Sequence, residues 1–188
     1  MLRERPTKIF ITGPPSSGKT TIVMKAVELA KKAGINVKGF FTPELRRHGV
    51  RTGFDIQVID GERIPLARKG VSGWPIKFGS YMINPNASRV FKNILVETLG
   101  RCDLLVLDEI GPMELLVEGA REFFIKALED EGQHVLGVVH RKLRDYDEIL
   151  YKEISKHKVY STTVDGPERI SSSVEKWIEG MGARIQKS

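Results

Sequence analysis

The sequence predicts an α/β protein with a mostly parallel central sheet, helices on both faces of it, and a small antiparallel hairpin insertion. Short apolar runs rich in β-branched residues alternate with longer segments of helical periodicity. The 188 residues, 40% of them hydrophobic, suit one domain with enough apolar material for a core. We expect this domain to span residues 1–180, the insertion to occupy about 41–74, and 181–188 to form a loose basic tail.

The first half of the chain contains two strands of the parallel type, one helix and a hairpin. The expected elements are a strand at Lys8–Thr12, a helix at Thr20–Ala33, a strand at Asn36–Thr42, and strands at Gly53–Ile59 and Arg63–Ala67. The helix ends before Gly34, a residue typical of helix C-termini. Asp60-Gly61 is a hairpin-turn dipeptide, so the two strands that flank it are expected to pair antiparallel.

The second half of the chain alternates helix and strand. Asn84-Pro85 opens a helix that Gly100 closes. The expected elements that follow are a strand at Leu104–Leu107, a helix at Leu115–Glu131, a strand at Val135–Val139, a helix at Leu143–Ile154, a strand at Val159–Thr163 and a helix at Pro167–Glu179. The unbroken apolar runs among the strands are typical of a parallel sheet covered on both faces.

Charge and composition narrow the function only slightly. Lys and Arg total 30 against 24 Asp and Glu, and the net charge of +6 suits nucleic acid, a phosphorylated small molecule or an acidic partner alike. The single cysteine, Cys102, cannot form an intramolecular disulfide, and the four histidines lack the spacing of a zinc site. No apolar stretch is long enough for a secretory signal or a membrane span, so we expect a cytoplasmic protein without membrane contact.

A glycine-rich phosphate-binding loop lies between the first strand and the first helix. The candidate nucleotide-binding residues here are Gly13, Pro14, Pro15, Ser16, Ser17, Gly18, Lys19, Thr20 and Thr21. Glycines at both ends let the backbone wrap a polyphosphate, and the helix N-terminus adds partial positive charge. We expect Lys19 to reach the β- and γ-phosphates as a catalytic residue and the Thr20 hydroxyl to ligate Mg²⁺.

A second candidate segment is an apolar strand that ends in two carboxylates. Its candidate nucleotide-binding residues are Leu104, Leu105, Val106, Leu107, Asp108, Glu109, Ile110 and Gly111. We assign Asp108 to Mg²⁺ and Glu109 to the water that attacks the γ-phosphate. Without the upstream phosphate loop, an acidic pair would more simply begin a solvated loop. The spacing also fits the D-x-x-G of guanine switches, but no N-K-x-D accompanies it.

Other residues are candidates to complete this site. If Glu109 is catalytic, another strand is expected between the phosphate-loop strand and Leu104–Leu107, and Val135–Val139 is the candidate. His140 would then lie beside the γ-phosphate as a catalytic sensor, with Arg141 next to it. Arg46 and Arg51 follow the second strand and are candidates to stabilise the transferring phosphoryl group. A solvated basic turn explains these two arginines equally well.

These motifs together resemble the thermophilic-type nucleoside-triphosphatase family, over about Lys8 to Thr163. The resemblance rests on residues 13–21, on 39–42 with Glu44, Arg46, Gly49, Arg51, Gly53 and Phe54, on 79–81, and on 107–115. It implies a P-loop core of the RecA type that slowly hydrolyses ATP, GTP and other nucleoside triphosphates with Mg²⁺. The sequence departs from the family at Ser16, at Pro112 and at 165–167, where many members have Gly, Lys and an Asn-Arg pair.

The leading hypothesis is therefore a Mg²⁺-dependent nucleoside-triphosphate phosphohydrolase. A nucleotide or small-molecule kinase is an alternative, because kinases share the phosphate loop and the insertion would close over an acceptor. A nucleotide-dependent switch that binds nucleic acid is a second alternative; it would account for the positive charge, but no nucleic-acid-binding motif supports it.

Overall fold

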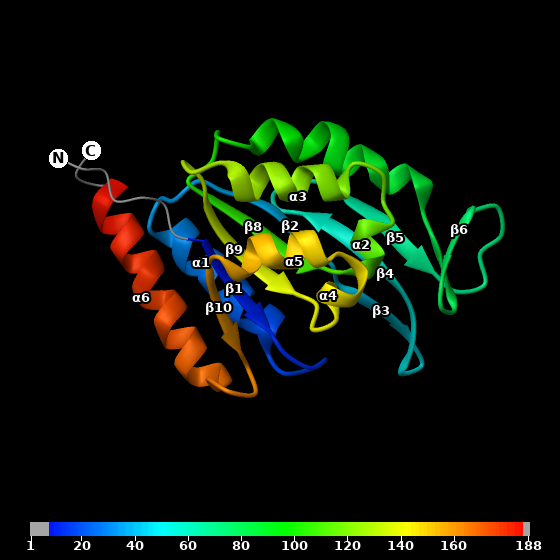
Figure 1. The fold of residues 1–188 in the computed structure, drawn as a ribbon, viewed down its shortest axis with the longest axis horizontal. Coiled ribbons are helices and arrows are strands. Elements are labelled where there is room, and N and C mark those ends of the chain that lie inside the picture. Colours follow the sequence, from blue (N-terminus) through cyan, green and yellow to red (C-terminus); the bar gives the residue numbers. More distant parts are fainter. Residues whose placement is uncertain (1–7, 186–188) are drawn as a thin grey trace.

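The computed structural model describes residues 8–185, and a ten-stranded sheet runs through its centre (Figure 1). The strand order is β10-β1-β9-β8-β2-β4-β5-β7-β6, with β3 paired to β4. The strands are β1 (Lys8–Thr12), β2 (Val37–Phe41), β3 (Glu44–Arg47), β4 (Val50–Val58), β5 (Arg63–Arg68), β6 (Ile76–Phe78), β7 (Tyr81–Ile83), β8 (Leu104–Ile110), β9 (His134–Val139) and β10 (Lys158–Ser161). The α-helices are α1 (Lys19–Lys32), α2 (Pro112–Leu115), α3 (Ala120–Glu129), α4 (Leu143–Tyr146), α5 (Glu148–Ser155) and α6 (Pro167–Ile185).

The central strands β10, β1, β9, β8 and β2 are all parallel, which confirms the predicted sheet type. β9 lies between β1 and β8, as the assignment of Glu109 required. Parallel strands bring their carboxyl ends to one edge of the sheet. The phosphate loop after β1, the acidic pair in β8 and His140 after β9 therefore gather at that edge.

The antiparallel insertion is larger than the sequence indicated. β4 pairs with β2, β3 and β5, and β7 joins β5 to β6, so antiparallel strands run from Glu44 to Ile83 rather than about 41–74. β3 forms in the segment expected to be a basic turn. The insertion extends the sheet away from α6, and β6 lies at the opposite end of the molecule (Figure 1).

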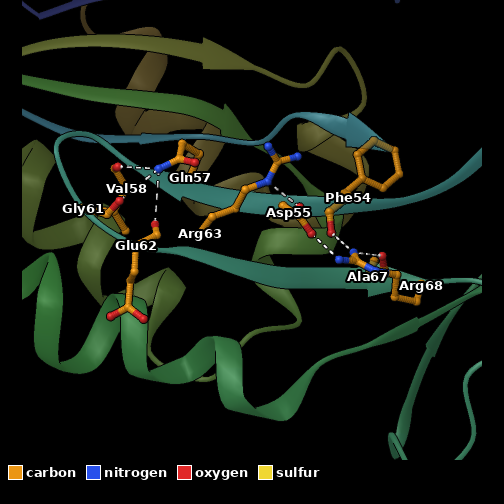
Figure 2. Close-up of polar contacts among 9 residues, drawn as sticks. All are labelled: Phe54, Asp55, Gln57, Val58, Gly61, Glu62, Arg63, Ala67 and Arg68. Carbon is orange, nitrogen blue, oxygen red and sulfur yellow. Dashed lines mark hydrogen bonds and ion pairs between the residues drawn. The ribbon is translucent and has the colours of Figure 1, made fainter. Parts of the chain in front are cut away.

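A buried carboxylate holds the β4–β5 hairpin together, as Figure 2 shows. Asp55 is only 6% exposed and accepts a hydrogen bond of 2.6 Å from Arg63 Nε. It also pairs with Arg68, whose Nη1 donates to the Phe54 carbonyl oxygen at 2.6 Å. At the turn, Gln57 Nε2 donates to the carbonyl oxygen of Gly61 at 3.1 Å. Arg68 on β5 thus fixes the backbone of Phe54 on β4.

Two hydrophobic cores, one on each face of the sheet, confirm the predicted layers. α1 and α6 pack against each other over one face, where Val23 and Ile178 are among the buried residues. α3 and α5 cover the other face, and Phe40, Phe91 and Phe124 form an aromatic cluster beneath them. The rings of Phe40 and Phe91 meet edge to face with centroids 5.5 Å apart.

Three expected helices are broken or irregular. The helix expected after Asn84 is instead a 3-10 turn (Pro85–Ala87), a π-turn (Val90–Ile94) and a further 3-10 turn (Val96–Thr98). Of the helix expected at Leu115–Glu131, only Ala120–Glu129 forms α3, which begins after Gly119 with its left-handed φ of 88°; Leu116 lies outside it and is 36% exposed rather than inward. The Leu143–Ile154 helix divides at Asp147, which accepts a capping hydrogen bond of 2.9 Å from Leu150 N.

The C-terminal segment was expected to be a loose tail from residue 181, and that expectation is wrong as far as the described residues reach. α6 continues to Ile185, with Met181 buried and Gly182 packed against Ala33. The remaining part of the expected tail, 186–188, lies outside the described residues. Within residues 8–185, no helix combines the length and the apolar character needed to cross a membrane.

Candidate active site

The phosphate loop connects β1 to α1, and its first glycine is sterically required. Gly13 has a φ of 152°, and a Cβ built there would lie 1.9 Å from Thr162 Oγ1. Thr162 follows β10 and donates from Oγ1 to Ser17 Oγ at 2.8 Å. Its backbone N–H donates to the Thr12 carbonyl oxygen at 2.9 Å. The segment after β10 therefore braces the phosphate loop from the side.

Lys19 lies over this loop. Its Nζ donates to the carbonyl oxygens of Gly13 at 3.0 Å and Pro14 at 2.7 Å. Burial lowers the pKa of Lys19, while the negative charges of Glu109 and Asp108 act in the opposite direction. The ammonium group is therefore electrostatically linked to both carboxylates at the end of β8.

Asp108 is a buried carboxylate beside the start of α1. It is 3% exposed, and burial raises its pKa to about 6, while Thr20 and Lys19 favour the ionised form. Its Oδ2 atom has no hydrogen-bond partner among the described residues. An unpartnered buried carboxylate oxygen is costly unless another group binds it.

The chemistry of this pair fits Mg²⁺. Thr20 Oγ1 and the free oxygen of Asp108 are hard oxygen ligands, and Mg²⁺ in nucleotide sites takes few protein ligands beside phosphate oxygens and waters. Within residues 8–185, no group of three or more His, Cys, Asp or Glu side chains is arranged to hold a metal by itself. The protein residues alone therefore supply only part of a coordination shell.

Glu109 has a neighbour that sequence reasoning missed. A Cβ built on Gly111 would lie 3.0 Å from Glu109 Oε1 and 2.9 Å from Glu114 Oε2, so the two carboxyl groups meet around this glycine. Burial, and to a smaller extent the negative charge of Asp108, raises the pKa of Glu109 to about 7. Burial, and to a smaller extent the negative charge of Glu109, raises the pKa of Glu114 to about 8. Both carboxyl groups therefore hold a proton more readily than an exposed glutamate does.

These groups line a cavity of about 680 Å³. The predicted loop and acidic-strand residues found in its wall are Gly13, Pro15, Ser16, Ser17, Gly18, Lys19, Thr20, Thr21, Asp108 and Glu109. Pro14, Ile110 and Gly111 are not among the wall residues. Leu104, Leu105, Val106 and Leu107 are 0% exposed in the core, so these four place the acidic pair and do not contact a ligand in the cavity.

The two candidate arginines lie differently. Arg51 is in the cavity wall, pairs with Glu44 and lies with its guanidinium carbon 5.4 Å from the centroid of the Phe54 ring. Arg46 is half exposed, pairs with the same glutamate at 2.8 Å and donates to the Gly49 carbonyl oxygen at 3.0 Å. Arg46 is absent from the cavity wall, so only Arg51 is brought to the site.

His140 is brought to the cavity by β9, as the sequence predicted. Its Nδ1 accepts a hydrogen bond of 3.2 Å from Lys142 N. Burial lowers the pKa of His140, and the nearby charges of Arg141 and Lys19 lower it further. The imidazole is therefore neutral at neutral pH, with Nδ1 acting as an acceptor.

Aromatic residues that the sequence analysis did not single out as site residues form the other end of the cavity. They are Phe54, Phe78, Tyr81 and Tyr146, accompanied by Met113. Phe78 and Tyr81 are neighbours in the β6–β7 hairpin, but Phe54 and Tyr146 are distant from it in sequence, so no spacing pattern indicates that the four rings meet. Phe54 and Tyr81 do belong to the segments on which the family resemblance rests, and Glu114 does too.

Comparison with known proteins points to one family. The model of the NTPase family matches residues 8–174. The chain is 41% identical to the nucleoside-triphosphatase THEP1 of Hyperthermus butylicus over 73% of each protein. It is 35% identical to the human cancer-related nucleoside-triphosphatase, over 70% of this chain and 74% of that protein.

Two solved structures have the same fold. The crystal structure of THEP1 from the hyperthermophile Aquifex aeolicus matches with a TM-score of 0.73 and 26% identity, covering 92% of this chain and 99% of that one. The solution structure of the human cancer-related nucleoside triphosphatase matches with a TM-score of 0.70 and 30% identity, covering 93% and 98%.

Proposed function

This chain belongs to the NTPase family of nucleoside-triphosphatases, and we propose that it hydrolyses ATP, GTP and other nucleoside triphosphates to diphosphate and phosphate with Mg²⁺. One observation carries the proposal. Lys19 at the start of α1 and the carboxylates Asp108 and Glu109 on β8 are far apart in sequence and meet in the wall of one cavity beside the phosphate loop. That is the set of charges that hydrolysis of a bound polyphosphate needs.

The phosphate loop and Lys19 bind the polyphosphate. The ammonium group exchanges its bonds to the loop carbonyls for bonds to phosphate oxygens, and the N-terminus of α1 adds partial positive charge. Thr20 and Asp108 would hold Mg²⁺ together with the nucleotide. The ion, when bound, neutralises charge on the phosphate oxygens.

Glu109 acts on the attacking water. In its ionised form it accepts a proton as the water oxygen bonds to the γ-phosphorus and the bond to the bridging oxygen breaks. The pKa of about 7 makes Glu109 a stronger base than an exposed glutamate, with about half of it ionised at neutral pH. Arg51 and neutral His140 would contact the phosphoryl group as it transfers.

Substitution of Glu109 tests this mechanism. Glu109→Gln should preserve nucleotide binding, measured by calorimetry with ATP and Mg²⁺, while steady-state phosphate release falls by roughly two orders of magnitude or more. Glu179→Gln on the exposed side of α6 is the matched control and should keep the wild-type rate. Unchanged turnover in Glu109→Gln would remove this residue from the mechanism.

A panel of nucleoside triphosphates, assayed with Mg²⁺ and with a chelator, tests the rest of the proposal. Because the site binds phosphates through the loop and Lys19, several bases should support turnover, and chelation should abolish it. Slow turnover is what the family resemblance implies, and the same assay measures the rate.

A further inference from the structure

The end of the cavity away from the phosphate loop is walled by two pairs of aromatic rings. Phe54 on β4 and Tyr81 on β7 meet with ring centroids 5.5 Å apart at 63°. Phe78 on β6 and Tyr146 on α4 meet with centroids 6.0 Å apart at 56°. Neither the polyphosphate nor the attacking water needs such a surface. Aromatic walls of this kind suit a planar ring.

These rings lie on the side of the site from which a nucleophile enters. Along the sheet, the phosphate loop follows β1, Glu109 ends β8, and β4, β7 and β6 lie beyond β8. Glu109 therefore lies between the loop and the ring pairs. In an in-line displacement the nucleophile approaches opposite to the leaving group. The diphosphate leaves on the loop side of Glu109, so the rings border the path of the incoming group.

One ring of the aromatic wall, Phe54, belongs to the hairpin shown in Figure 2, which fixes its backbone. Arg68 bonds to the Phe54 carbonyl oxygen while its guanidinium pairs with buried Asp55. Arg51 lies over the Phe54 ring and pairs with Glu44, which also pairs with Arg46. A wall fixed before a ligand arrives binds without the entropic cost of ordering it.

The base beside the rings indicates an acceptor that carries a proton. Arg51 shares Glu44 with Arg46, and burial raises the pKa of Glu114. The other cations in the wall, Arg141 and Lys142, follow β9, and both are exposed. A base such as Glu109, in turn, is useful only to a nucleophile that carries a proton, which is a hydroxyl group and not a phosphate dianion.

We propose that the aromatic end of the cavity binds a nucleoside as a second substrate, and that its hydroxyl replaces water as the phosphoryl acceptor. The hydroxyl oxygen bonds to the γ-phosphorus, its proton passes to Glu109, and the bond to the bridging oxygen breaks. The electron pair of that bond leaves with the nucleoside diphosphate. This inference rests on the proposed phosphoryl site, and it adds the occupant of the acceptor side.

The experiment measures both products in one reaction. The full-length protein is incubated with ATP and Mg²⁺, with and without adenosine, guanosine, cytidine, uridine or the corresponding monophosphates. Free phosphate and newly formed nucleoside monophosphate are separated by chromatography. Binding of adenosine alone is followed by saturation-transfer NMR. We expect at least one nucleoside to bind and to be phosphorylated at the expense of phosphate release.

Ring substitutions connect this activity to the wall. Tyr81→Leu and Tyr146→Leu should each raise the nucleoside concentration for half-maximal transfer about tenfold, since stacking on one ring contributes roughly that much. The KM for ATP in nucleoside-free phosphate release should stay unchanged, because the proposal places the triphosphate outside these rings. Tyr151→Leu on α5, outside the cavity wall, is the matched control and should behave as wild type.

The outcomes separate this inference from the proposed function. Normal phosphate release without nucleoside binding, or binding without transfer, overturns the acceptor role and leaves the hydrolase standing. A raised KM for ATP in the ring variants would place the base of the triphosphate itself between the rings, and phosphorylation of monophosphates alone would mean a charged acceptor. Either result refutes the inference. If the wild-type protein releases no phosphate from ATP at all, the proposed function is refuted instead.

Discussion

Replacing Glu114 with glutamine should stabilise the protein increasingly as the pH rises through the neutral range. The carboxyl group of Glu114 is 4% exposed and has the carboxyl group of Glu109 beside it. Burial raises its pKa from 4.5 to about 8 in the folded chain, so the folded state retains a proton that the unfolded state has already lost. Glutamine has the same shape as the protonated acid and does not ionise, so it adds no pH dependence to the free energy of unfolding.

The magnitude follows from proton linkage. Between the two pKa values the folded state binds one more proton than the unfolded state, so wild-type stability falls by about 1.4 kcal/mol per pH unit on this account. The loss begins near pH 4.5, and it levels off once the pH passes about 8 and the folded form ionises as well. From about pH 5.5 to about pH 8, the advantage of the variant should therefore grow by about 3 kcal/mol. A difference in unfolding free energy between the amide and the acid that does not depend on pH cancels in this comparison.

The assay is guanidinium unfolding of both proteins at several pH values in this range. The quantity that matters is how the difference in unfolding free energy changes with pH. Glu179→Gln on α6, which replaces an exposed glutamate, provides the baseline and should show no such change. If the advantage of Glu114→Gln is the same at every pH, Glu114 is not held neutral by the fold, and the account of the carboxyl pair fails.

Three further predictions concern other parts of the site and the hairpin. Phosphate release at saturating ATP should rise about tenfold from about pH 6 to about pH 8, because Glu109 acts ionised and has a pKa of about 7; a flat profile would exclude it as the base. Gly13→Ala should weaken ATP binding in calorimetry, because its methyl group meets Thr162 Oγ1; addition of Thr162→Ala should restore part of the affinity. Asp55→Asn should lower the free energy of unfolding by roughly 1–3 kcal/mol in guanidinium titration, because Arg68 and Arg63 lose their buried charge partner; no loss would mean that the hairpin does not depend on this charge.

The parallel part of the fold was predictable because its signals are local. Apolar runs, terminal glycines and the phosphate loop are each recognised from a few consecutive residues. The role assigned to Glu109 also predicted that β9 lies beside β8. The breaks in the helices were not predictable from periodicity. Gly119 and Asp147 interrupt apolar patterns that continue on both sides of them. Tertiary packing and capping decide whether the helix continues through such a residue or breaks there.

The site was predictable only where its residues follow a motif. Lys19, Thr20 and Asp108 lie where the spacing placed them, beside one cavity. The aromatic wall brings together rings from 54 to 146, and contacts of that range leave no period in the sequence. The basic turn carried two equivalent candidates, and the structure separates them: Arg51 lies in the cavity wall, while its cross-strand partner Arg46 is half exposed and lies outside the wall.

The long open sheet also determines how copies of this molecule meet one another. Unpaired strand edges are templates for joining other chains, and the risk grows with their length. The strands at the two ends of this sheet have only four and three residues, and each carries an exposed lysine, Lys158 on β10 and Lys77 on β6. A neighbouring molecule would gain few backbone bonds at either end and would have to accommodate a charge. These two edges therefore offer a second copy of the chain little to pair with.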